Sequence, residues 1–302
     1  MKNQNVHTSD NDFNSARMKA LRNSVFSILN PEKKEMLSFY DIKSLIKPKA
    51  EFYQGIQSVP LDAIAGSEGR YHDFTRAFLP KREHLRARWR SVNIAAIEDV
   101  YLPPIKAFKI GETYFVRDGN HRVSVARARG QIDIDAEITE ITSEIEITPD
   151  ITIKELRKKV IAFELRRIRE RSGLDEWIDF DEIKFTAPGR YEELLRHVIG
   201  HQEFLTQSAE GDVTLENAAR SWFLSIFLPV IEIIHSEKLV DRFPGRTEAD
   251  LYVWVMKHWN DLDNRYGDFP KIQKNGTVPG KFTVNRMYMR LRKLLRKLNR
   301  SA

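Results

Sequence analysis

The chain has 302 residues, 41% hydrophobic and 30% charged, which is long enough for two domains that each bury a core. It contains no cysteine, which excludes disulfides and thiolate metal sites and is typical of a reducing, cytoplasmic location. It has no run of 18 apolar residues and no apolar leader stretch, so we expect neither a membrane span nor a secretory signal.

The net charge of +6 is not evenly distributed. Residues 281–302 contain eight basic residues and no acid, so residues 1–280 together carry a net charge of −2. The high isoelectric point therefore describes one short segment. The rest of the chain lacks the general basic character of a broad nucleic-acid surface.

Residues 1–50 are predicted to form two helices. Residues 1–14 are polar and are expected to fray, and Ser15 is expected to cap the first helix. Ser38, with Asp41 three residues later, is expected to cap a short second helix. Because this segment carries no chemical constellation, we interpret it as a packing or partner element.

A cluster of polar residues follows a short predicted strand and turn at residues 59–66. Arg70 and Arg76 would clamp an anion there, with Asp73 holding one guanidinium group or acting as a base. The alternative is a surface network of Asp and Arg that contributes little energy. Farther along, a solvated helix face is the simpler interpretation for Arg86, Arg88 and Arg90.

Residues 105–130 are predicted to form a β-hairpin and a helix. Residues 105–110 and 113–117 are rich in strand-forming residues, and Gly111 lies at the reversal between them. An apolar stripe at helical spacing then runs to residue 128, and Gly130 is a natural stop after the last turn. This hairpin and helix are expected to organise the first domain.

The turn between strand and helix reads Asp118, Gly119, Asn120, His121 and Arg122. A helix N-terminus presents unpaired N–H groups and a partial positive charge, and Gly119 allows a backbone to approach closely. His121 and Arg122 would add directed donors, which together describe a phosphate cradle. The equally open alternative is a capped turn, with Asp118 or Asn120 as the N-cap and Arg122 in solvent.

The stretch PPIKAFKIGETYFVRDGNHRVSVARARGQ resembles the core of the ParB/sulfiredoxin-like superfamily, over about residues 58–140. Members of that superfamily hold nucleotide phosphates with a strand, a glycine-containing turn and a helix start. This chain keeps the glycine and the His-Arg pair, but Asn120 stands where sulfiredoxins place a reactive cysteine. Sulfinic-acid reduction through a protein thiol is therefore excluded. Some ParB-like phosphotransferases carry a turn close to this one.

The resemblance implies a nucleoside triphosphate, CTP or ATP, bound with Mg²⁺. Its phosphates would be held by Gly119, Asn120, His121 and Arg122, with Arg70, Asp73 and Arg76 at the same site. A regulatory nucleotide-binding protein is the first expectation. In a phosphotransferase or NTP hydrolase, Asp118 would bind Mg²⁺ or act as base, and His121 would stabilise the transferred group. No metal site made of protein side chains alone is expected.

Residues 132–138 alternate apolar and acidic residues, which predicts a half-buried strand. We expect it to be the last strand of the sheet. Residues 139–150 suit a linker or edge hairpin, so we place a domain boundary there. The domains predicted are N-terminal helices at 1–50, a ParB/sulfiredoxin-like mixed-sheet domain at 51–148, a helical domain at 149–270, and a linker with a basic amphipathic helix at 271–302. The fold class expected is therefore α+β.

In the helical domain, capping boxes are predicted at Thr152 with Glu155 and at Thr247 with Asp250. A further helix with His197 and His201 four residues apart presents both imidazoles on one face, but the remaining ligands of a zinc site are missing. The stretch FPGRTEADLYVWVMKH resembles an uncharacterised helical domain that follows ParB-like domains in bacterial proteins. That resemblance implies architecture but no chemistry.

Thr214 is expected to start a long apolar helix that Pro229 kinks or breaks. The core of this domain is expected to contain Trp222, Trp254 and Trp259. Residues 281–302 would bind DNA or RNA, or simply pack their apolar face. The third hypothesis is a non-enzymatic module that binds nucleic acid or a protein partner, in which the central turn is only structural. A recognition helix-turn-helix like that of ParB proteins is not evident, which argues against DNA recognition of the ParB kind. A homodimer is also open.

Overall fold

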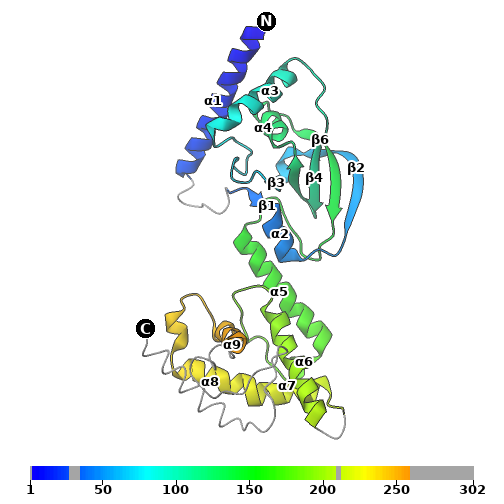
Figure 1. Cartoon of the computed structure of the whole chain (residues 1–302), viewed down its shortest axis with the longest axis vertical. Helices are drawn as coiled ribbons and strands as arrows, with labels where there is room; N and C mark the ends of the chain where they lie inside the picture. Colours follow the sequence, from blue (N-terminus) through cyan, green and yellow to red (C-terminus); the bar gives the residue numbers. More distant parts are fainter. Residues whose placement is uncertain (1, 27–34, 209–211, 259–302) are drawn as a thin grey trace. The chain divides into compact units, whose positions relative to one another are not determined.

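A computed structural model of the chain describes residues 2–26, 35–208 and 212–258 (Figure 1). It divides into two compact units, residues 1–156 and 157–302, which are described separately. The first contains a mixed six-stranded sheet with helices and the second contains only helices among its described residues, so the fold is α+β as predicted. The final helix predicted at 281–302 and the linker before it lie outside the described residues.

Unit 1 is built on a sheet with the strand order β1-β3-β5-β4-β6-β2. Its strands are β1 (Leu37–Ser38), β2 (Glu51–Pro60), β3 (Ile64–Ser67), β4 (Ile105–Ile110), β5 (Thr113–Asp118) and β6 (Asp133–Ile141). β4 and β5 form the predicted antiparallel hairpin. The pairs β1–β3, β3–β5 and β4–β6 are parallel, while β2 pairs antiparallel with β6 at one edge.

The helices of unit 1 are α1 (Lys2–Phe26), α2 (Phe39–Ile46), α3 (Arg86–Ile97) and α4 (Asn120–Ala128). The core between sheet and helices contains Trp89, Val116 and Val123, all fully buried. A second apolar cluster holds α2 to the sheet, where the Phe39 ring stacks on the Phe108 ring at 4.1 Å. Burial of these side chains stabilises the hairpin and α4 on a rigid support.

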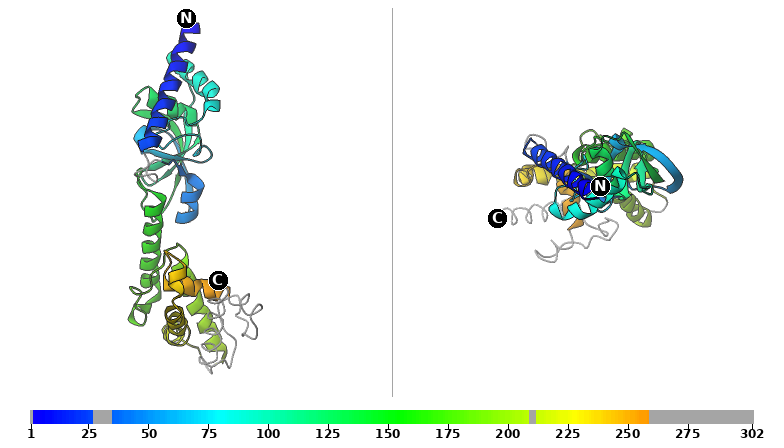
Figure 2. Two further views of the ribbon diagram at one scale, coloured as in Figure 1. Left: turned by 90° about the vertical axis from the view of Figure 1, so that its left-hand side faces the viewer. Right: turned by 90° about the horizontal axis from the view of Figure 1, so that it is seen from above.

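The first residues do not fray as predicted, because α1 begins at Lys2. α1 lies against α3 (Figures 1 and 2). The Phe13 ring is fully buried and meets Trp89 edge-to-face at 5.7 Å. Ala16 and Ala20 of the same helix are buried against Leu79. These apolar contacts help to hold α1, although its first residues are polar. The segment is part of unit 1 and not a separate domain.

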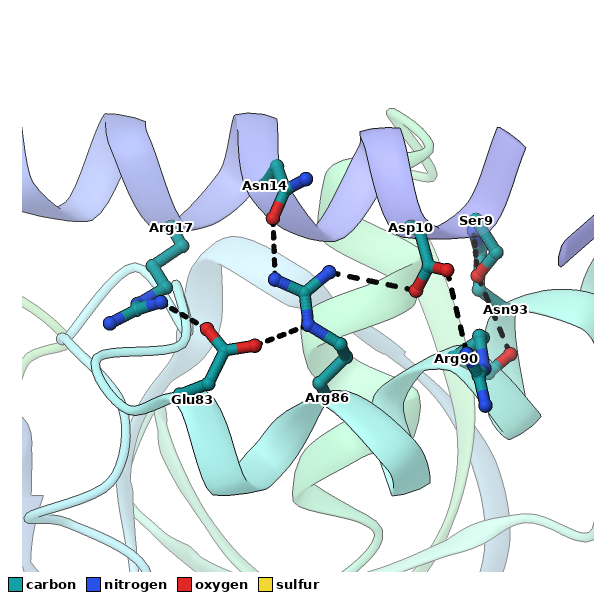
Figure 3. A network of polar contacts seen from close by, with 8 residues as sticks. All are labelled: Ser9, Asp10, Asn14, Arg17, Glu83, Arg86, Arg90 and Asn93. Atoms are coloured by element: carbon teal, nitrogen blue, oxygen red, sulfur yellow. Dashed lines mark hydrogen bonds and ion pairs between the residues drawn. The ribbon is translucent and has the colours of Figure 1, made fainter. Parts of the chain in front are cut away.

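A seam of polar contacts joins α1 to α3 (Figure 3). Arg86 is its centre: it contacts Asp10 at 3.5 Å and donates to Asn14 Oδ1 at 2.6 Å, and it also pairs with Glu83. Its guanidinium lies 4.6 Å from the Phe13 ring centroid. Arg90 reaches the other oxygen of Asp10 at 3.4 Å. Arg86 and Arg90, predicted to be solvated, instead fasten α1.

Arg86→Ala should loosen α1 by about 1–2 kcal/mol, because several partners in one network lose their donor together. We expect faster proteolysis within α1 and a lower midpoint in urea. The matched control is Arg82→Ala, which removes an exposed arginine without a partner among the described residues. If both variants are cleaved at the same rate, the seam does not hold α1.

Unit 2 begins within α5 (Ile153–Ser172) and continues with α6 (Arg190–Ser208), α7 (Leu215–Trp222), α8 (Leu228–Ser236) and α9 (Glu248–Lys257). Short 3₁₀ turns lie at Leu174–Glu176 and Leu239–Arg242. One contiguous apolar core, including Leu194, Trp222 and Tyr252, fills the space between these helices.

The two predicted capping boxes are confirmed, whereas Ser15, predicted to cap the first helix, lies inside α1. The Thr152 hydroxyl accepts from the Glu155 amide at 3.1 Å, and the Glu155 carboxylate accepts in return from the Thr152 amide at 2.9 Å. Thr247 and Asp250 form the second capping box. Local pairs of this kind need only neighbours three residues apart, which is why the sequence reveals them.

Pro229 does not break the apolar helix. A π-helical turn at Phe223–Phe227 joins α7 to α8, and Pro229 lies at the second position of α8. The wider turn changes the hydrogen-bond pattern where proline has no N–H to donate. The helical stretch Leu215–Ser236 is long and apolar enough to cross a membrane by length and composition. In this fold, however, it contributes Ile226, Val230 and Ile233 to the core of unit 2.

The two histidines of α6 are buried and bind hydroxyl groups from other helices. His197 Nδ1 lies 3.2 Å from the Tyr252 hydroxyl, and His201 Nε2 lies 3.0 Å from Ser221 Oγ. Trp222 Nε1 also donates to the Tyr252 hydroxyl at 3.2 Å. Trp222 is thus in the core as predicted, but Trp254 is 41% exposed and stacks on His258, which corrects that prediction. Trp259 lies outside the described residues.

Candidate functional site

The backbone of the central turn requires glycine at position 119. Gly119 follows β5 directly and has φ = +104°, in the left-handed region. A Cβ atom there would lie 2.5 Å from Ile105 Cγ2, and Ile105 is fully buried. Any side chain would therefore meet both backbone strain and a fixed neighbour. β4 and β5 together determine where α4 begins.

The N-terminus of α4 has no side-chain cap. Gly119 is the N-cap residue, and the first intrahelical bond runs from the Val123 amide to the Gly119 carbonyl at 3.0 Å. The amides of Asn120, His121 and Arg122 therefore have no acceptor inside the helix. The alternative in which Asp118 or Asn120 caps the turn is wrong, because glycine occupies that position.

Asn120 is buried beneath the turn, with 7% of its surface exposed. Its Oδ1 atom has no hydrogen-bond partner among the described residues. His121 Nδ1 is also buried without such a partner. At this turn, two polar side-chain atoms therefore have no hydrogen-bond partner within the part of the chain that the structure describes, and three backbone amides have no acceptor inside the helix. These groups are available to bind a ligand.

Arg122 donates its hydrogen bonds to groups of the protein itself. Its guanidinium donates to the carbonyls of Pro103 and Pro104, the latter at 2.9 Å, and to Asp118 Oδ2 at 2.5 Å. Its side chain is only 14% exposed, while that of Asp118 is 68% exposed. Arg122 therefore holds the loop before β4 against the turn, instead of lying in solvent or reaching outward to an anion.

The positive charges near the turn come from other segments. Arg70 and Asp73 lie in the loop after β3 and form an ion pair at 2.9 Å. Asp73 also lies 3.8 Å from His84 Nε2. Arg88, on α3, is exposed and has no ion pair with any residue that the structure describes. We call the group of Arg70, Asp73, His84, Arg88 and His121 the His121 cluster.

His121 responds electrostatically to the rest of this cluster. Burial lowers its pKa to about 4, and the charges of Arg70 and Arg88 act in the same direction. Asp73 opposes them more weakly. The Phe74 ring meets the imidazole edge-to-face at 5.4 Å and keeps it partly dry. His121 is therefore neutral near pH 7, in a field that favours a negatively charged neighbour.

Arg76 does not join the His121 cluster. Its guanidinium donates to the carbonyls of Pro149 at 2.5 Å and Ile151 at 2.8 Å, and burial lowers its pKa. It thus ties the loop after β3 to the end of unit 1. Of the residues predicted for the site, the structure gathers Gly119, Asn120, His121, Arg70 and Asp73, and it uses Arg76 and Arg122 elsewhere.

Sequence reasoning missed His84 and Arg88. Both lie near the start of α3, more than thirty residues before the turn, and no short-range pattern connects them to it. Arg86 and Arg90, four residues apart, share the face that meets α1, so Arg88 between them lies on another face. That alternation was the only signal available in the sequence.

Two cavities lie beside α4. One, of about 300 Å³, is lined by Arg122 and by apolar residues that include Val92, Leu102 and Val125. The other, of about 730 Å³, lies between α1 and the end of α4 and is lined by Trp89, Asn93 and Arg127 among others. Neither of these two cavities is lined by a residue of the His121 cluster.

Metal binding by protein side chains alone finds no support in the described part of the chain, where no three His, Cys, Asp or Glu residues are grouped. Mg²⁺ usually retains waters and needs only one or two carboxylates when it is bound with phosphates. Asp118 and Asp73 are the carboxylates that lie at or near the turn. Asp118 pairs with Arg122 and Asp73 pairs with Arg70.

Fold and site together define a mixed-sheet α+β domain with a candidate anion site at a glycine-led helix N-terminus. No model of a known protein family matches the chain. A search of curated proteins likewise finds no match. The geometry of the turn must therefore support any proposal by itself.

Proposed function

We propose that unit 1 is a ParB-like domain that binds a nucleoside triphosphate, CTP or ATP with Mg²⁺, through its phosphates at the start of α4. The observation that carries the proposal is that three amides without an intrahelical acceptor lie beside a neutral histidine that feels the charges of Arg70 and Arg88, two exposed arginines from two other segments. Backbone N–H groups at a helix start are preorganised donors for phosphate oxygens.

Each group has a distinct role in this proposal. The amides of Asn120 and His121 donate to phosphate oxygens, and Arg88 and Arg70 neutralise the charge. Gly119 lets the backbone approach, since no Cβ projects from the turn. Arg122 positions the turn by holding the loop at residues 103–104. In a cytoplasmic regulatory protein, nucleotide occupancy would be transmitted to a DNA, RNA or protein partner, for which residues 281–302 are the predicted contact.

A phosphoryl-transfer activity is the second candidate, and the exposure of Asp118 favours it. Its carboxylate lies two residues before the first free amide and is 68% exposed, where it would reach a phosphate-bound Mg²⁺. Turnover of ATP or CTP that is lost in Asp118→Asn, while binding is retained, would support transfer over binding alone. Binding without turnover would leave the regulatory proposal.

Arg88→Ala should weaken binding of Mg²⁺-ATP or Mg²⁺-CTP by about 10–100-fold, because a charge-assisted contact contributes roughly 1.5–3 kcal/mol. Isothermal titration of the full chain measures this directly. The matched control is Arg129→Ala, which removes an exposed arginine beyond the opposite end of α4 and should leave affinity unchanged. No binding of either nucleotide or of inorganic triphosphate by the wild type would refute the proposal.

The proposal also predicts a pH dependence through His121. A bound polyanion should raise the pKa of His121 from about 4 towards its ordinary value, so binding takes up a proton. Affinity should therefore rise as pH falls from about 6.5 towards 4. Ligand phosphates titrate in part of this range, so the quantity to compare is the difference between wild type and His121→Gln. Parallel pH profiles would remove His121 from the site.

A further inference from the structure

The strand β2 forms an open edge of the sheet in unit 1. It is ten residues long and β6 is its only neighbouring strand, so no strand of the described residues lies along its outer edge (Figure 1). A free edge of this length displays a row of unpaired N–H and C=O groups that can pair with another strand.

The side chains of β2 are unusually apolar for an exposed edge. Phe52, Tyr53 and Ile56 are 53%, 67% and 63% exposed. Residues 52–60 contain no charge, although charged side chains are the common protection of an edge strand. A bulge between Tyr53 and Gly55 is the only irregularity in its pairing with β6, which leaves residues 55–60 as a regular run.

The absence of charge favours a second copy of the same strand as the occupant. Around a two-fold axis each residue meets its own equivalent or a near neighbour, so any charge on the strand would face a like charge. Ile56 pairs with Glu137 of β6, and Lys106 lies 3.4 Å from Glu137 and compensates its charge. An acidic or basic peptide would find no complementary charge on residues 52–60 of β2, and Glu51 at its start already pairs with Lys43.

The opposite edge of the sheet limits the assembly to two copies. That edge is β1, which consists of Leu37 and Ser38 only. Pairing of β2 with β1 of another copy would involve only two residues of β1, and it would leave a free edge on each added copy, so the assembly would grow without limit. Pairing of β2 with β2 uses the same edge of both copies and gives a closed dimer. Only one edge is long enough to be shared, so a closed dimer is the favoured outcome.

We propose that β2 pairs antiparallel with β2 of a second copy, forming a continuous twelve-stranded sheet from two six-stranded sheets. The two-fold axis lies near Ile56, whose side chains pack against each other, and Tyr53 lies on the same face of the sheet because it pairs with Thr139. The proposal is independent of nucleotide binding, since β2 contributes no residue to the His121 cluster.

Sedimentation velocity of the full chain over a concentration series tests the proposal. The wild type should dimerise, and Ile56→Lys should raise the dissociation constant by about tenfold or more by placing like charges across the axis. Tyr101→Lys is the matched control, because Tyr101 is 80% exposed and lies outside the sheet. A wild type that stays monomeric, or a dimer unaffected by Ile56→Lys, would overturn the proposal.

Cross-linking tests the register in the same protein. The chain contains no cysteine, so Ile56→Cys introduces the only thiol. Directly opposed residues of an antiparallel pair have Cβ atoms about 4.5–5.5 Å apart, close to disulfide geometry. Mild oxidation should convert the Ile56→Cys variant to covalent dimer rapidly. Tyr101→Cys should react only slowly, and equal rates in the two variants would contradict pairing through β2.

Discussion

Replacement of Gly119 by alanine should destabilise unit 1 by about 2–4 kcal/mol, a large effect for a single methyl group. Two costs act together. The backbone angle of +104° disfavours any side chain, and the new Cβ would lie 2.5 Å from the buried Ile105. Hydrogen exchange of peptides from β4, β5 and α4 measures the loss where it occurs.

Two other glycines separate these costs. Gly130 has φ = +74° with nothing near its Cβ position, so Gly130→Ala should cost only about 1 kcal/mol of strain. Gly69 has neither a positive φ nor a close neighbour, and Gly69→Ala should change stability by less than about 0.5 kcal/mol. Equal losses in all three variants would show that the contact with Ile105 is not restrictive.

Acid should destabilise unit 2 by about 3 kcal/mol through His197 alone. Burial lowers the pKa of His197 from 6.5 to about 4 in the folded state. The unfolded chain therefore binds more protons between these values, so stability is complete above pH 6.5 and is lost as pH falls towards 4. Burial also lowers the pKa of His201, which adds a loss of the same sign.

The Tyr252 hydroxyl is the hydrogen-bond partner of the buried His197 imidazole. It accepts from Trp222 Nε1 at 3.2 Å, which leaves its own proton for His197 Nδ1 at 3.2 Å. A protonated imidazole cannot accept that bond. His197→Asn keeps an acceptor near the same place but does not titrate. Urea unfolding of the variant, followed by hydrogen exchange in α6 and α9, should show a shallower pH dependence than wild type, and an identical slope would refute the assignment.

The sequence was most informative where the deciding contacts are local. The hairpin of β4 and β5, the glycine at the head of α4 and the capping boxes at Thr152 and Thr247 each depend on residues a few positions apart. Their signals are therefore complete within a short window. The α+β class followed from the same local patterns.

Prediction from the sequence was weaker where the hydrogen-bond partners of a polar side chain lie far away in the sequence. Arg76 and Arg122 looked like anion ligands, but each donates to two backbone carbonyls brought near by the fold. Arg86 looked solvated, but it joins α3 to α1 across more than seventy residues. An arginine satisfies its donors with whatever acceptor lies closest, and only the folded chain determines which acceptor that is.

By itself, the sequence determined that this protein has a glycine-led turn at the start of a helix, without a thiol, in an α+β chain. The tertiary structure alone decided which charges act on that turn, because Arg70, His84 and Arg88 reach His121 from segments that no sequence period connects. It alone also decided that β2 is left at an edge, since strand order depends on how the whole sheet buries its faces. Turns and caps depend on residues that are neighbours in the sequence, whereas electrostatic fields and free sheet edges depend on how the whole chain folds.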